Sequence, residues 1–70
     1  MMPITMGDPG KEYGIVRIGG NDVARAHLQD MGFVPGAKVT LVSAVDGNII
    51  VNVKNVRIAL GMQMAQKIFI

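Results

Sequence analysis

The sequence predicts a small all-β fold: a five-stranded, partly open barrel with one α-helix between strands one and two and a short helical turn before the last strand. The length of 70 residues leaves room for a single domain, residues 1–70. Valine and isoleucine supply 17 residues against three leucines, and β-branched side chains favour strands over helices. Short runs of alternating apolar residues also recur between tight-turn residues, as in small barrels.

The first third of the chain predicts a lead-in segment and one strand. Prolines and glycines break up residues 1–11, where Ile4 and Met6 are the candidates for packing. Residues 13–18 alternate and form the first expected strand, with Ile15 on one face and Val16 and Ile18 on the other.

A helix is expected over residues 22–31. Asn21 or Asp22 can cap its first turn, and Gly32 can end it in the left-handed conformation. Its apolar arc places His27 on the side facing the barrel. The expected members of this arc are Val23, Ala24, His27, Leu28 and Met31.

The second half predicts strands joined by tight turns. Asp46 and Gly47 separate two alternating runs and favour a type I′ hairpin, because both central residues of that turn need a positive φ. Asn55 predicts a second tight turn. The expected segments are strands 38–45, 49–54 and 56–60, a helical turn within 61–66, and a closing strand 67–70.

Composition excludes several classes of function. The chain has no cysteine, so it lacks disulfides and thiolate sites and suits a reducing compartment, which indicates the cytoplasm. No apolar run approaches the roughly 18 residues that span a bilayer, so membrane insertion is not expected. The net charge is only +2 with scattered basic residues, which does not favour nucleic acid as a partner.

Several short motifs occur in a fixed order along the chain. Residues 25–39 read RAHLQDMGFVPGAKV, a helix, a glycine stop and a Pro-Gly turn. They are followed by GNIIVNV at 47–53, RIAL at 57–60, Ala65 and IFI at 68–70. This ordered set resembles the FeoA family of bacterial ferrous iron transport and covers nearly the whole chain. Two positions depart from the family pattern: Asn55 replaces a usual glycine, and Gly61 replaces a basic or polar residue.

The resemblance implies an SH3-like barrel and a cytoplasmic accessory or regulatory role beside FeoB, the membrane transporter of ferrous iron. The expected partner contact is with the cytosolic part of FeoB. Two alternatives remain open at this point. One is a metal-linked regulatory domain like the SH3-like C-terminal domain of DtxR-type regulators. The other is an RNA-binding SH3-like module that would use a basic stripe of Arg17, Arg25, Lys38, Lys54 and Arg57.

Metal binding and catalysis have weak support in the residues. His27 and Asp30 are three residues apart on the expected helix and are the only metal-ligand candidates. Two ligands of mixed type, with no further histidine or any cysteine, do not make a ferrous site. No hydroxyl has an evident histidine and carboxylate partner, so no enzyme activity and no cofactor are expected.

The candidate partner-binding residues fall in two groups. The first is an apolar patch on the helix and its exit, formed by Leu28, Phe33 and Val34 with Arg25 at its rim. Core packing is the competing interpretation of Leu28 and Phe33. The second is the pair Met62 and Met64, of which one must face outward from a short helical turn. An exposed apolar surface of this kind also leaves self-association open.

Overall fold

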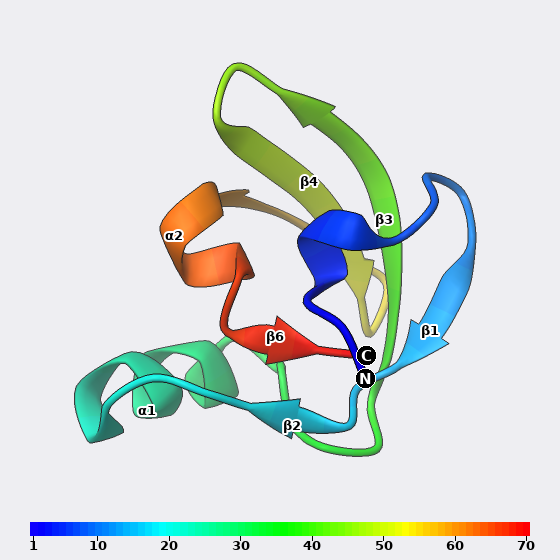
Figure 1. The fold of residues 1–70 in the computed structure, drawn as a ribbon. Coiled ribbons are helices and arrows are strands. Elements are labelled where there is room, and N and C mark those ends of the chain that lie inside the picture. Colours follow the sequence, from blue (N-terminus) through cyan, green and yellow to red (C-terminus); the bar gives the residue numbers. More distant parts are fainter.

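Six strands form two antiparallel sheets in the computed structural model, which describes residues 1–70 (Figure 1). The larger sheet has the order β1-β3-β4-β5, and the smaller sheet pairs β2 with β6. The strands are β1 (Glu12–Gly14), β2 (Arg17–Ile18), β3 (Lys38–Val45), β4 (Asn48–Val53), β5 (Val56–Gly61) and β6 (Ile68–Phe69). The helical segments are the 3₁₀ turn η1 (Ile4–Met6), α1 (Asp22–Asp30) and α2 (Met62–Ala65). The predicted all-β class and element order are confirmed.

The expected first strand is divided between the two sheets, which makes six strands of the predicted five. Ile15 donates its N–H to the Ala37 carbonyl at 2.9 Å, whereas Val16 donates to the Phe69 carbonyl at 2.7 Å. The chain therefore leaves β3 and joins β6 between these two residues. The change of direction buries both Ile15 and Ile18 and leaves Val16 exposed, so the predicted grouping of Val16 with Ile18 is wrong.

The β3–β4 hairpin has the predicted turn, with φ of 51° at Asp46 and 80° at Gly47. Its strand β3 contains a bulge, because the register shifts between Leu41 and Ser43. One extra residue reverses the inward and outward faces beyond it. Val45, expected on the same face as Leu41, is therefore exposed.

The chain ends close the barrel. Met2 and Ile70 exchange two backbone hydrogen bonds of 3.0 and 2.8 Å, which brings the N-terminus beside the C-terminus (Figure 1). Ile4 becomes fully buried through this closure, while Met6 stays exposed. The lead-in segment is thus part of the barrel.

The core contains thirteen buried apolar side chains, drawn from both sheets and all three helical segments. Its members are Ile4, Ile15, Ile18, Leu28, Phe33, Val39, Leu41, Ile49, Val51, Val53, Leu60, Ala65 and Ile68. Each large aliphatic side chain buried in this way contributes about 1.5–3 kcal/mol of transfer free energy.

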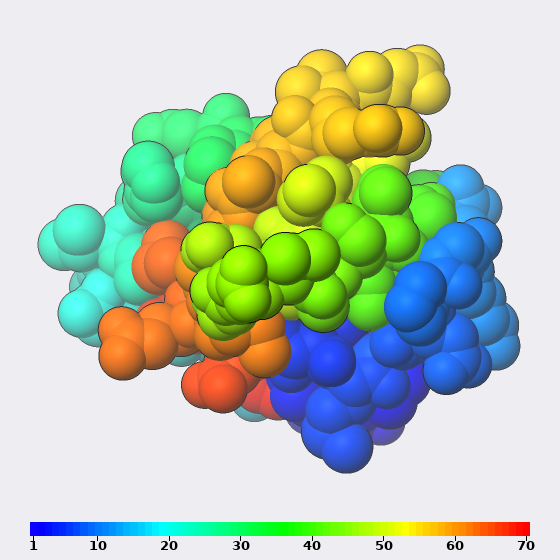
Figure 2. All heavy atoms as spheres, turned by 90° about the horizontal axis from the view of Figure 1, so that it is seen from above, coloured from blue at the N-terminus to red at the C-terminus, as the bar shows by residue number.

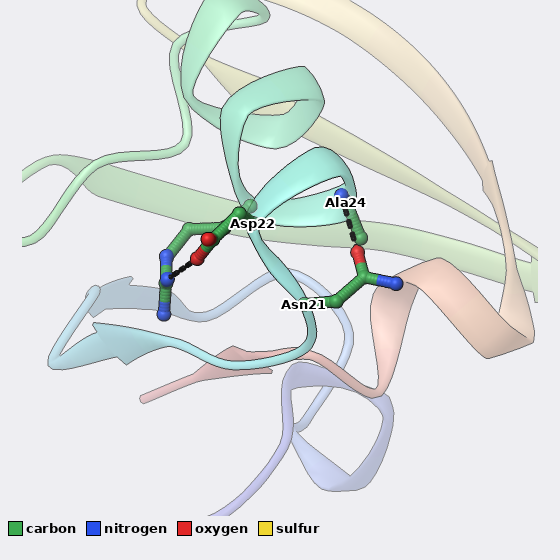
Figure 3. A network of polar contacts seen from close by, with 4 residues as sticks. Asn21, Asp22 and Ala24 are labelled. Carbon is green, nitrogen blue, oxygen red and sulfur yellow. Dashed lines mark hydrogen bonds and ion pairs between the residues drawn. The ribbon is translucent and has the colours of Figure 1, made fainter.

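Helix α1 begins at the predicted cap and ends before the predicted glycine. The Asn21 side-chain oxygen accepts a 2.8 Å hydrogen bond from the Ala24 N–H (Figure 3), and Gly32 has a φ of 106°. Only Leu28 of this helix is buried.

The predicted apolar arc of α1 is partly wrong. Ala24 and Arg25 are half-buried on either side of Leu28, whereas Val23 is 80% exposed and His27 is exposed. The stem of an arginine can cover apolar surface while its charged end stays in water. The buried stripe of α1 is therefore shifted away from Val23 and toward Arg25, which lies on the other side of Leu28.

Candidate functional site

The structure separates the six candidate partner-binding residues into core and surface. Leu28 and Phe33 are fully buried and belong to the core, which corrects their place in a contact surface. Arg25, Val34, Met62 and Met64 are half-buried and keep part of their side chains at the surface.

The exit of α1 explains why Phe33 is buried. Its N–H donates to the Leu28 carbonyl at 3.0 Å, and Gly32 turns the chain back under the helix. Val34 follows in a turn that the Ala37 N–H closes on the Val34 carbonyl at 3.0 Å. We define Arg25, Val34 and the exposed Val23 as the α1 surface; Val23 and Arg25 are about 200° apart around the helix, so these residues do not form one continuous apolar patch. Arg25 forms an ion pair with Asp22 within the helix (Figure 3).

Helix α2 lies against β5, η1 and β4. Figure 2 shows η1 in blue and α2 in orange meeting beside the green tip of the β3–β4 hairpin. Met6 on η1 is 68% exposed. We define Met6, Met62 and Met64 as the α2 surface.

Met6 was not predicted as a site residue. It lies in a lead-in with no apolar period, and only the return of the C-terminal strand places η1 beside α2. A signal for it existed in the composition, since six methionines in 70 residues is a high number.

Lys67 connects α2 to the start of α1. Its Nζ donates to the Gln63 carbonyl at 3.0 Å, and its methylene groups lie against Gly20, just before the cap of α1. The two helices are thereby held on the same side of the barrel (Figure 1).

The metal-ligand candidates are both on exposed positions of α1. His27 and Asp30 have no third histidine, cysteine or acidic residue that completes a ligand group. The surface carries no pocket. Neither α-helix has the length and apolar character required to cross a membrane.

Two residues of the predicted basic stripe interact within the chain. Arg17 lies over the Phe69 ring, with its guanidinium carbon 5.0 Å from the ring centre, and Arg25 pairs with Asp22. The remaining three, Lys38, Lys54 and Arg57, come from three separate segments of the large sheet and its turns.

Comparison with known proteins gives one family. The model of the family described as FeoA domain matches residues 2–70. No curated protein sequence matches the chain. A crystal structure of an iron uptake regulatory protein (FeoA) is 33% identical, with a TM-score of 0.86 over 94% of this chain and 89% of that one.

Two further solved structures share the fold at lower identity. FeoA of Stenotrophomonas maltophilia, described as an SH3 domain protein and solved with zinc, is 22% identical, with a TM-score of 0.84 over 97% of this chain and 87% of that one. A manganese-dependent transcriptional repressor is 17% identical, with a TM-score of 0.85 over 94% of this chain and 38% of the repressor. Both show the SH3-like fold.

Proposed function

The chain belongs to the FeoA domain family, and from this premise we propose that it is a non-enzymatic, cytoplasmic accessory protein of ferrous iron transport that binds the cytosolic part of a FeoB-type transporter. The family match over residues 2–70 supports the transport role. The 33% identical structure described as an iron uptake regulatory protein points the same way.

The observation that carries the choice of surface is the methionine grouping of η1 and α2. Met62 and Met64 are half-buried beside η1, which presents the exposed Met6. Unbranched thioether side chains repack easily and serve adaptable protein-binding surfaces. The α1 surface is the weaker candidate, because its largest predicted members, Leu28 and Phe33, belong to the core.

Docking would regulate transport through differential affinity. If the α2 surface binds one conformation of the transporter more tightly than another, binding shifts the population toward the favoured conformation. A tenfold difference in affinity corresponds to about 1.4 kcal/mol of bias.

The test is a titration of isotope-labelled protein with the cytosolic domain of a FeoB-type transporter, with and without guanine nucleotide, followed by backbone amide shifts. We expect shifts at Met6 and at residues 62–65.

The Met6→Lys variant tests the surface directly. Met6→Lys changes an exposed side chain and should weaken binding about tenfold or more, because a charge then faces an apolar contact. Val23→Lys, a change at an apolar residue on α1 that is 80% exposed against 68% for Met6, is the matched control and should bind as the unmodified protein does.

Binding that is weakened by Val23→Lys and unaffected by Met6→Lys would move the proposal to the α1 surface. No shift at any residue, with both proteins folded, would reject the cytosolic domain as the partner.

A further inference from the structure

Strand β5 has the longest unpaired edge in the molecule. It contains six residues, and its only strand partner is β4. The other edge strand of the large sheet, β1, has three residues, and β2 has two. The outer side of β6 is covered by the N-terminus, through the Pro3–Phe69 bridge and the Met2–Ile70 hydrogen bonds.

In β5, residues whose backbone groups bond to β4 alternate with residues whose backbone groups point outward. The Lys54–Asn55 turn has two residues with positive φ and places Val53 opposite Val56, which is a hydrogen-bonded pair in such a hairpin. The Met62 N–H, six residues after Val56, donates to the Gly47 carbonyl at 3.0 Å, which confirms that every second residue from Val56 bonds toward β4. Because successive residues alternate, the N–H and C=O groups of Arg57 and Ala59 and the N–H of Gly61 point away from β4, whereas the Gly61 C=O faces α2, which has Gly61 as its N-cap.

These three residues are open to solvent. All three are exposed, and Arg57 and Ala59 have no strand partner other than β4. Proteins usually protect such an edge with proline, a bulge or several charges. Along β5 only Arg57 is charged, and its pairing with β4 runs through all six residues without a register shift.

We propose that two copies of this chain associate by antiparallel pairing of β5 with β5, centred on Ala59. A two-fold axis makes the pairing antiparallel, so one register fixes the whole contact. Centring on Arg57 would place the two arginines directly opposite each other, which is unfavourable. Centring on Ala59 instead places Arg57 of each copy opposite Gly61 of the other and allows about four backbone hydrogen bonds, two between the Ala59 residues and one from each Gly61 N–H to the Arg57 carbonyl of the other copy.

The same register joins the apolar faces of the two sheets. Ile58, which is half-buried, lies beside Leu60 of the second copy. The contact is small, so the dissociation constant should fall between about 1 µM and 1 mM.

Amide hydrogen exchange and sedimentation, both measured against protein concentration, test the proposal. Exchange at Ala59 and Gly61 should slow by about fivefold or more as the dimer fills. The amides of Val56, Ile58 and Leu60 already bond to β4 and are the internal reference. Ala59→Pro removes the central outward donor and should abolish the dimer, whereas Ala59→Val keeps the donor and should retain it.

Three results would overturn the proposal. They are a monomer at every concentration up to the millimolar range, a dimer that survives Ala59→Pro, and a dimer whose formation leaves exchange at the Ala59 and Gly61 amides unchanged. The exchange measurement uses the unmodified protein, so it decides the question even where Ala59→Pro fails to fold.

Discussion

A Cβ atom on Gly20 would lie 2.7 Å from the Cδ of Lys67, because the lysine side chain crosses the backbone just before α1. Gly20 has a φ of 90°, and the Lys67 Nζ is held by the Gln63 carbonyl. The end of α2 and the start of α1 are therefore packed together through one lysine and one glycine. Both helices carry candidate contact residues, so this junction sets how the two surfaces lie relative to each other.

Gly20→Ala should destabilise the protein by about 1–3 kcal/mol, measured by urea unfolding. Most of the loss should come from the positive φ, because a lysine side chain can move away from a new methyl group. The loss should therefore persist when Gly20→Ala is combined with Lys67→Ala. Gly14→Ala is the control: Gly14 has an ordinary φ and no atom within 4 Å of an added Cβ. Full rescue by Lys67→Ala would show that the contact, and not the backbone, requires glycine.

Phe33→Ala should lower the free energy of unfolding by about 3–5 kcal/mol, because it removes the largest fully buried side chain. Phe33→Leu keeps an apolar side chain and should cost less. Partner binding by the folded Phe33→Leu protein should equal that of the unmodified protein. A stable Phe33→Leu protein with weakened binding would restore Phe33 as a contact residue.

Asn21→Ala should cost about 0.5–2 kcal/mol in thermal or urea unfolding, because the Ala24 N–H loses its side-chain acceptor (Figure 3). Asn21→Ser retains a capping oxygen and should be nearly neutral. Asp22→Asn removes the exposed ion pair with Arg25 and the negative charge in the first turn of α1, and should cost about 1 kcal/mol or less. An equal loss for Asn21→Ala and Asn21→Ser would contradict the role of the cap.

The elements that could be predicted are those fixed by local chemistry. The Asp46–Gly47 turn, the Asn21 cap and the Gly32 stop each depend on the backbone preference of one or two residues. The break between β1 and β2 depends instead on Ala37 and Phe69, which are distant in sequence and accept successive N–H groups. The bulge at residue 42 differs, because the alternation of residues 38 to 45 breaks at Ser43, but this break alone does not show that a residue is inserted.

The candidate surfaces were only partly predictable for the same reason. A hydropathy pattern shows that Leu28 and Phe33 are apolar, and it does not distinguish a core position from a contact position. Met62 and Met64 could be located on a helical turn, whereas Met6 joins them only through the closure of the chain ends.

The turn between β4 and β5 offers a stabilising change. Lys54 and Asn55 have φ values of 51° and 64°, as a type I′ turn requires, and glycine is the preferred second residue of that turn. Asn55→Gly should therefore raise the midpoint of urea unfolding, by up to about 1 kcal/mol in free energy. Lys54 is better left in place, because its Cδ lies 3.7 Å from a Cβ built on Gly32 and so covers the end of α1.

Asn55→Ala tests the direction of the effect, since alanine lacks the local hydrogen bonds that help asparagine adopt the left-handed region. It should lower stability by about 1–2 kcal/mol. If Asn55→Gly and Asn55→Ala both lowered stability, the asparagine side chain, and not the backbone conformation, would be what the turn requires.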